Sequence, residues 1–259
     1  MKDEPGKNPI QVAGRLFGVL EMLADRREAS LGEISEELGL NKSTAHRVLS
    51  SLAYMDYVKQ ADNGKYQLSL KIVELSNRIV EVNKENILSI VYPCLHSLAL
   101  KTGETVHFVQ RDGIDAVYVA KMEPSARTTT TSSRIGSHVP LYRSGVGKAI
   151  SSTMAFEMRR ELWERSNVIK ATKNTITDFN VFNDCVERAK MDGYAIDDEE
   201  NELGIKCVAA AIRTPFDVDG VAQYAFSVTG PENRVRGERC DRIATMVLEA
   251  KDEIDEKFK

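Results

Sequence analysis

The 259-residue chain has neither an excess of basic residues nor a long apolar run. Its formal net charge is -4, and residues 1–82 carry 11 Lys and Arg against 12 Asp and Glu. A small DNA-binding domain needs positive charge only where it touches phosphate, so composition neither supports nor excludes DNA as a partner. No apolar run approaches the roughly 20 residues of a membrane span, and we therefore expect no membrane partner.

Cysteine is also scarce, and its spacing excludes the common zinc motifs. The four cysteines form no Cys-x-x-Cys pair and no Cys/His pattern, so we expect no metal and no cofactor. The start MKDEPGKNPI is not a signal peptide, which favours free thiols in a cytoplasmic protein. With 42% hydrophobic and 29% charged residues, the chain is typical of a folded protein with a buried core.

Three helices followed by a short hairpin are predicted at the N-terminal end. Residues 10–25 carry apolar side chains at helical spacing, and Ser30 begins a second helix with a capping box. Gly39 is a suitable stop for that helix, and Asn41 can cap a third. The strand-like segments YVKQ and KYQLS then flank an Asp-Asn-Gly turn, which is a strong hairpin signal. This order predicts a winged helix-turn-helix over residues 8–70.

The polar side of the third predicted helix, NKSTAHRVLSSLAYMDYV, consists of hydroxyls and cations and contains no acid. Serine and threonine are mediocre helix formers, which indicates a requirement other than helix stability. The second helix of a helix-turn-helix enters the major groove of DNA. Each residue taken alone is equally well explained as facing solvent. The DNA-binding residues that we predict on this helix and on the hairpin are Lys42, Ser43, Thr44, His46, Arg47, Ser51, Lys59 and Lys65.

Beyond residue 70 the pattern changes from helical to mixed. We expect a linker helix over residues 71–85, a domain boundary near residues 80–86, and a kink or break at Pro93. The segments ETVHFVQRD and AVYVAKME read as a hairpin. Later strands are expected near residues 194–199, 205–213 and 221–229, and helices near 145–165, 179–192 and 236–258. Residues 86–259 therefore predict a mostly antiparallel sheet packed by helices, which makes the whole chain α+β.

The segment YRSGVGKA looks like a phosphate loop, but Tyr142 and Ala149 stand where that motif requires Gly and Ser or Thr. Ser144 can cap a helix here and leave the N–H groups of residues 145–147 at its positive end, where a small carboxylate would fit. The alternative is a glycine turn that only allows close packing.

Two further features, an acidic run and a cysteine, raise the question whether the protein is an enzyme. The acidic run from Asp197 to Glu202 is typical of a solvated loop or a metal site, although no His lies near it in sequence. Cys207 lies in an apolar strand, where cysteine most often packs. As a nucleophile it would need a base, and no motif links it to His107 or His138. A small-molecule enzyme that uses Cys207 or the acidic run is the alternative function.

The motifs, in order, resemble the IclR (isocitrate lyase regulator) family of bacterial transcription factors. The resemblance spans almost the whole chain and is carried by LGEISEELGLNKSTAHRVLSSLAYMDYV, GKYQLS, YPCLHSLALKTGETVHF, VPLYRSGVGKA, GYAIDDEENELGIKCVAA and FSVTGP. One departure is IQVAGRLFGVLEML, where many relatives have Leu-Glu-Arg. The resemblance implies a ligand-responsive regulator and not an enzyme. We expect a repressor, since a bound roadblock needs no contact with polymerase.

The resemblance also implies a GAF-like effector-binding domain that senses a small carboxylate such as an oxo acid or a sugar acid. Its SRIGSHVPLYRSGVGKAI segment is most similar to family members that control the catabolism of sugar acids such as 2-keto-3-deoxygluconate. Many relatives have Ala at the position of Val146, so valine would narrow the pocket. We add Arg143 as a hypothesis, because it could pair with a second ligand charge. Thr128 and Thr131, in the hydroxyl-rich loop, are expected to line the pocket as well. The effector residues matched by motif are Val139, Gly145, Val146, Asp197, Cys207, Ser227 and Thr229.

For its partners we therefore expect double-stranded, near-palindromic operator DNA and a small organic acid. Family members form dimers and tetramers, so a homodimer or dimer of dimers is expected, paired through the N-terminal helices. The helical segment at residues 70–101 would connect the effector pocket with the DNA-binding heads.

Overall fold

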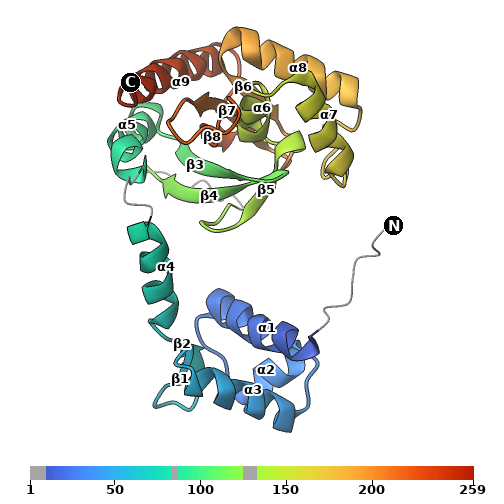
Figure 1. Ribbon diagram of the computed structural model, residues 1–259, viewed down its shortest axis with the longest axis vertical. Helices are drawn as coiled ribbons and strands as arrows, with labels where there is room; N and C mark the ends of the chain where they lie inside the picture. The colour runs from blue at the N-terminus through green and yellow to red at the C-terminus, as the bar shows by residue number, and fades with distance from the viewer. Residues whose placement is uncertain (1–9, 83–86, 125–132) are drawn as a thin grey trace. The chain divides into compact units, whose positions relative to one another are not determined.

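The computed structural model describes residues 10–82, 87–124 and 133–259 (Figure 1). The chain divides into two compact units, residues 1–86 and 87–259, and each has a hydrophobic core of its own. Thr128 and Thr131, two of the predicted effector residues, lie outside the described residues. None of the described helices is both long and apolar enough to cross a membrane.

The first unit has the winged helix-turn-helix architecture that the sequence predicts. Its elements are α1 (Gln11–Arg26), α2 (Leu31–Glu37), α3 (Lys42–Tyr54), β1 (Val58–Gln60), β2 (Tyr66–Leu68) and α4 (Lys71–Val82). The two strands pair antiparallel, and Ala29 joins Tyr66 through two backbone hydrogen bonds of 3.0 and 2.8 Å. The hairpin is thereby tied to the segment between α1 and α2.

Local capping explains where α2 and α3 begin and end. The Ser30 hydroxyl accepts the Glu33 N–H while the Glu33 carboxylate accepts the Ser30 N–H, which completes the predicted capping box. Gly39, with φ of +59°, ends α2 in a conformation that favours glycine. The Asn41 side chain then accepts the Thr44 N–H at 2.8 Å and begins α3. These caps fix the turn between the two helices.

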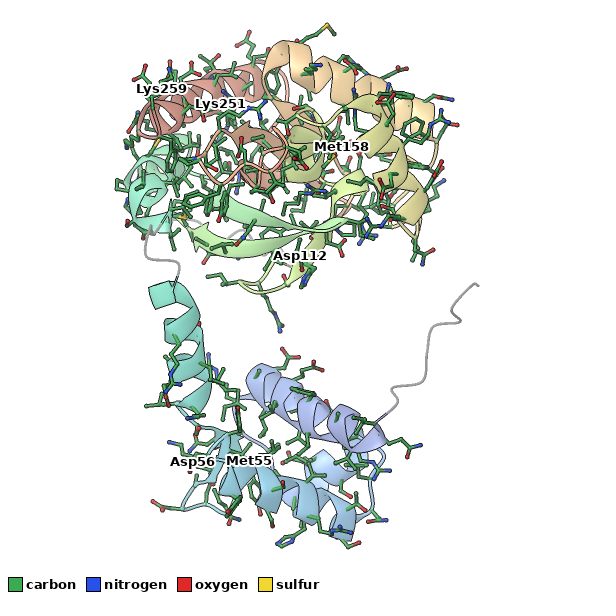
Figure 2. All side chains as sticks on the ribbon, viewed as in Figure 1. Met55, Asp56, Asp112, Met158, Lys251 and Lys259 are labelled. Atoms are coloured by element: carbon green, nitrogen blue, oxygen red, sulfur yellow. The ribbon has the colours of Figure 1, made fainter. Side chains whose placement is uncertain are left out.

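The helices of this unit bury their apolar faces against one another and against the hairpin. Met55 and Asp56 follow α3 directly and lead into β1 (Figure 2). The buried core comprises Val19, Met22, Leu23, Ala29, Ile34, Ala45, Val48, Leu49, Leu52 and Val58. Because the whole apolar stripe of α3 is used in this core, its opposite side is left for solvent or a ligand.

The second unit begins with α5 (Ile87–Thr102), which excludes one of the two alternatives predicted at Pro93. Pro93 lies inside this helix and does not break it. A proline in a helix interior removes one backbone hydrogen bond. The fully buried side chains of Val91 and Leu95 on either side hold the helix against the core, and that burial offsets the missing bond.

Within the described residues, six antiparallel strands form the sheet of this unit in the order β5-β4-β3-β8-β7-β6. The strands are β3 (Thr105–Asp112), β4 (Asp115–Met122), β5 (His138–Pro140), β6 (Ala195–Asp198), β7 (Ile205–Ile212) and β8 (Tyr224–Pro231). The short strand β5 was not predicted. It follows a segment whose hydroxyl-rich composition reads as a loop.

Helices cover both faces of this sheet (Figure 1). They are α5, η1 (Leu141–Arg143), α6 (Gly145–Ser151), α7 (Phe156–Arg165), α8 (Phe179–Asp192) and α9 (Glu238–Glu256). The helical stretch expected near residues 145–165 is thus two helices. One core lies between the sheet and α5 with α9, and another lies on the α6 side. The fold is therefore α+β, as expected. One face of the sheet packs against α5 and α9, and the site described below lies on the opposite face, which α6 covers.

Candidate functional site

The solvent side of α3 displays the predicted DNA-binding residues. Lys42, Ser43, His46, Arg47 and Ser51 are exposed, and Thr44 is half-buried beside the Asn41 cap. Among the described residues, Lys42, His46 and Arg47 form no ion pair or side-chain hydrogen bond. The helix therefore carries cations that remain available for an external anion.

The hairpin offers one free cation where two were predicted. Lys59 on β1 is exposed and has no ionic partner among the described residues. Lys65, in contrast, pairs with Glu28 at 2.9 Å, and Asn63 approaches the same carboxylate at 3.4 Å. The hydrogen bond that Lys65 donates to Glu28 raises the pKa of Lys65. Lys65 is thus engaged within the protein, and Lys59 is the hairpin lysine without an ionic partner among the described residues.

A cavity in the second unit brings together residues that are far apart in sequence. Among the predicted effector residues, seven line it: Val139, Gly145, Val146, Asp197, Cys207, Ser227 and Thr229. Its other described lining residues are His107, Tyr118, Ser133, Ser144, Asn201, Glu202 and Ile205. Arg143 does not line it. The guanidinium of Arg143 instead lies over the Tyr142 ring, 5.9 Å from its centroid, so its proposed ligand contact has no support in the geometry.

The register of the sheet explains the convergence. Asp197 on β6 lies opposite Cys207 on β7, and Cys207 lies opposite Thr229 on β8. Ser227, two residues before Thr229, shares its face of the sheet and lies opposite His107 on β3. Four neighbouring strands therefore contribute one polar row on the side of the sheet that α6 covers.

Glycines allow α6 to approach this row closely. A Cβ atom on Gly145 would lie 3.4 Å from both the Ala209 Cβ and the Asp197 backbone nitrogen. A Cβ on Gly147 would lie only 2.1 Å from the carbonyl oxygen of Leu141, which no side chain could tolerate. The Ser144 hydroxyl caps the helix as predicted, accepting the Gly147 N–H at 3.1 Å. Close packing thus requires Gly147, while Gly145 borders the cavity.

The hydroxyl groups of the cavity form a connected network around a buried histidine. His107 Nδ1 lies 3.1 Å from the Thr229 hydroxyl, and its Nε2 lies 2.7 Å from the Ser133 hydroxyl. The Thr229 hydroxyl donates to the Cys207 sulfur at 3.2 Å and lies 3.3 Å from that of Ser227. Burial lowers the pKa of His107 to about 3, so the imidazole is neutral at physiological pH. The sequence showed no sign of this role for His107.

Asp197 is the buried acid of the cavity, with a 4% exposed side chain. Its Oδ1 accepts the Glu200 N–H at 2.8 Å and the Asn201 N–H at 3.4 Å. Lys148 lies nearby on α6 but forms a buried ion pair with Glu200. Burial raises the pKa of Asp197 to about 7, and the charge of Lys148 only partly opposes this effect.

Cys207 lacks the surroundings of a nucleophile. Burial raises the pKa of its thiol, and its hydrogen-bond partner is a threonine hydroxyl and not a base. Among the described residues there is also no cluster of His, Cys, Asp or Glu that could hold a metal ion. The cavity is only partly enclosed, and its described lining residues leave a volume of about 30 Å³.

A winged helix-turn-helix with a free cationic recognition face, joined in one chain to an α+β domain with a polar cavity, defines a DNA-binding regulator with a ligand-binding domain. Comparisons with known proteins identify the family. Residues 12–62 match the IclR helix-turn-helix domain, and residues 80–256 match the C-terminal domain of the bacterial transcriptional regulator IclR. The chain belongs to the IclR family of transcriptional regulators, which are not enzymes.

Several relatives are similar over most of the chain. The DNA-binding transcriptional repressor YiaJ of Escherichia coli is 34% identical over 209 residues, which cover 80% of this chain and 72% of YiaJ. The HTH-type transcriptional regulator KdgR of Escherichia coli is 30% identical over 244 residues, which cover 93% of this chain and 90% of KdgR. The crystal structure of the Thermotoga maritima IclR matches with a TM-score of 0.82 at 28% identity, over 96% of this chain and 98% of that chain. YiaJ is named as a DNA-binding transcriptional repressor and KdgR as a transcriptional regulator, so transcriptional regulation is common to both names.

Proposed function

We propose that this protein is a cytoplasmic repressor that binds a near-palindromic operator through α3 and the hairpin. The observation that carries the proposal is the exposed face of α3, where Lys42, His46 and Arg47 have no partner among the described residues. Cations on the N-terminal part of a recognition helix reach base edges and phosphates in the major groove. A homodimer or a dimer of dimers would place two such helices on two half-sites.

Replacement of Arg47 tests the DNA-binding part of the proposal. We expect Arg47→Ala to weaken binding to the DNA upstream of the protein's own gene by about 1–3 kcal/mol, the usual effect of removing one arginine that reads a base. The measurement is a mobility-shift titration at fixed, moderate salt. Arg78→Ala is the matched control, since it removes the same charge from an exposed i,i+4 pair with Glu74 in the same unit. Equal affinity of wild type and Arg47→Ala would show that α3 is not the reading helix.

We propose further that a small organic acid, such as a sugar acid or an oxo acid, binds in the cavity and changes DNA affinity. The Ser227 hydroxyl supplies a donor, and Val139 and Val146 supply apolar walls. An effector changes DNA affinity only through its different affinity for the DNA-competent and DNA-incompetent conformations.

A thermal-shift screen of monocarboxylic oxo acids and sugar acids tests the effector class. Hits are expected to stabilise wild type, to change operator affinity, and to have much less effect on Ser227→Ala. Ser152→Ala is the control. The half-buried hydroxyl of Ser152, the residue directly after α6, donates to the Ala149 carbonyl oxygen and does not line the cavity among the described residues. A hit that stabilises Ser227→Ala as strongly as wild type would bind elsewhere.

A further inference from the structure

One tyrosine of the first unit differs from the other two in its surroundings. Tyr57 and Tyr66 are partly buried and pack against the core of the unit. Tyr54, the last residue of α3, is 91% exposed and stands directly before Met55 and Asp56, which Figure 2 labels. A ring exposed to this extent buries almost no apolar surface, so the stability of the fold does not explain a tyrosine at this position.

The helical spacing of Tyr54 shows the direction in which it points. The buried residues of α3 are Ala45, Val48, Leu49 and Leu52. Another row of this helix, in which every residue is exposed, recurs at i, i+4, i+7 and i+11 and consists of Ser43, Arg47, Ser50 and Tyr54. At about 3.6 residues per turn, the exposed row lies directly opposite the buried row. Tyr54 therefore stands in the middle of the outward face, in line with Arg47.

The position of Tyr54 along the helix determines which part of a DNA duplex it meets. Tyr54 follows Arg47 by seven residues, which is about 10 Å along the axis at a rise of about 1.5 Å per residue. The major groove is about 12 Å wide, and the N-terminal residues of a recognition helix contact the base edges. With Arg47 at the bases, the C-terminal end of α3 lies at the rim of the groove, beside the sugar-phosphate backbone.

The chemistry of the phenol fits a backbone phosphate. A tyrosine hydroxyl is a hydrogen-bond donor, and tyrosine is among the neutral side chains that bond phosphate oxygens in protein–DNA complexes. The exposed cations Lys42, His46 and Arg47 of the same helix supply the charge that attracts a duplex to this face. The hydroxyl of Tyr54 then adds a directed contact that carries no charge.

We propose that the Tyr54 hydroxyl donates a hydrogen bond to a backbone phosphate at the rim of the major groove and so fixes the position of α3 on the DNA without reading its sequence. The inference rests on the proposed function, in which α3 enters the groove. Contacts to phosphate set the register of a recognition helix, whereas contacts to base edges specify the sequence. Tyr54 is thus a positioning residue, and Arg47 reads the sequence.

The test compares Tyr54→Phe and Tyr54→Ala with Arg47→Ala on two duplexes of equal length. One is the DNA upstream of the protein's own gene, and the other has the same bases in shuffled order. Mobility-shift titrations with the full chain are made at several salt concentrations. We expect Tyr54→Phe to weaken binding to both duplexes by the same factor, about fivefold, the usual effect of one lost hydrogen bond. Arg47→Ala should instead reduce the preference for the upstream duplex.

The salt dependence separates the phenol from the cations. The slope of log binding constant against log salt concentration should be the same for Tyr54→Phe and wild type, because the phenol neutralises no phosphate charge. Tyr92→Phe is the matched control, since it makes the same change at an exposed tyrosine of the second unit, and it should bind as wild type does. Thermal unfolding and sedimentation of each variant monitor its fold and its oligomeric state.

Wild-type affinity of Tyr54→Phe for both duplexes, together with weaker binding by Arg47→Ala, would overturn the inference and leave the proposed function intact. A loss confined to the upstream duplex would also overturn it, because Tyr54 would then read bases. An altered sedimentation of Tyr54→Ala would overturn it as well, by placing the ring between copies of the chain. If wild type binds neither duplex, the proposed DNA binding itself is wrong and the inference falls with it.

Discussion

The DNA-binding unit and the effector-binding unit handle their polar side chains in opposite ways. In the first unit the functional candidates lie on the surface, with Lys42, His46 and Arg47 unpaired among the described residues. In the second unit the candidate polar side chains are mostly buried and bonded to one another, as His107 and Thr229 are.

The difference agrees with the sizes of the proposed ligands. A DNA duplex cannot be enclosed by a small domain. The side chains that contact it must therefore be exposed on a helix that fits into the major groove. A small acid can be surrounded, so the side chains that contact it are buried. Buried polar side chains need hydrogen bonds within the protein to offset the loss of their contacts with water. Substitutions should consequently affect stability most in the second unit and affinity most in the first.

The largest effect is expected from Glu104→Gln in the second unit. Glu104 is fully buried, and its carboxylate is bonded by Arg234 at 2.6 and 2.9 Å and by Arg239 at 2.8 Å. Removing one partner of such a network costs about 3 kcal/mol, because charges remain without a counter-ion. The single tryptophan, Trp163, lies in this unit, so its fluorescence during urea unfolding measures the change.

The control for that experiment is Glu161→Gln, which removes an exposed i,i+4 pair with Arg165 in the same unit. We expect it to cost less than about 0.5 kcal/mol. Similar destabilisation by both variants would contradict the distinction between buried and exposed charge in this domain.

An intermediate effect is expected from Asn41→Ala in the first unit. The Asn41 side chain accepts the Thr44 N–H at 2.8 Å and begins α3, and removal of such a cap costs about 1 kcal/mol. Hydrogen exchange of the α3 amides should become correspondingly faster. Ser50→Ala, an exposed change on the same helix, should leave hydrogen exchange nearly unchanged. Equally fast exchange in Asn41→Ala and Ser50→Ala would show that the Asn41 cap does not stabilise α3.

The smallest effect distinguishes the two lysines of the hairpin. Lys59→Ala should reduce the slope of log binding constant against log salt concentration by about one, as expected when one lysine no longer neutralises a phosphate. Lys65→Ala should reduce it less, because Glu28 already engages the Lys65 ammonium. Equal reductions would mean that the pair of Lys65 and Glu28 opens when DNA binds.

The two units also differ in how far the sequence predicts them. The boundaries of α2 and α3 follow from Ser30, Gly39 and Asn41, since caps act over three or four residues and are visible in any local stretch. The cations of α3 follow from helical periodicity in the same way. The helix does not break at Pro93, one of the two predicted alternatives, because local backbone preference yields to the burial of the helix around it.

The cavity is different, because apart from the turn at residues 144–147 its residues were predicted only from family motifs. Asp197, Cys207, Ser227 and Thr229 were matched by motif, and neither spacing nor periodicity shows that they meet. His107 and Tyr118 had no recognisable signal. They reach the cavity only because β3 and β4 pair beside β8 in a particular register.

By itself, the amino-acid sequence determined the three helices, the hairpin and the cationic face of α3, since these depend on interactions between residues close in the chain. Tertiary structure alone decided that Lys65 is engaged by Glu28, that Arg143 stands outside the cavity, and that Asp197 is buried near the ion pair of Lys148 and Glu200. The physical reason is that burial and long-range strand pairing, which set contacts and pKa values, have no local signature.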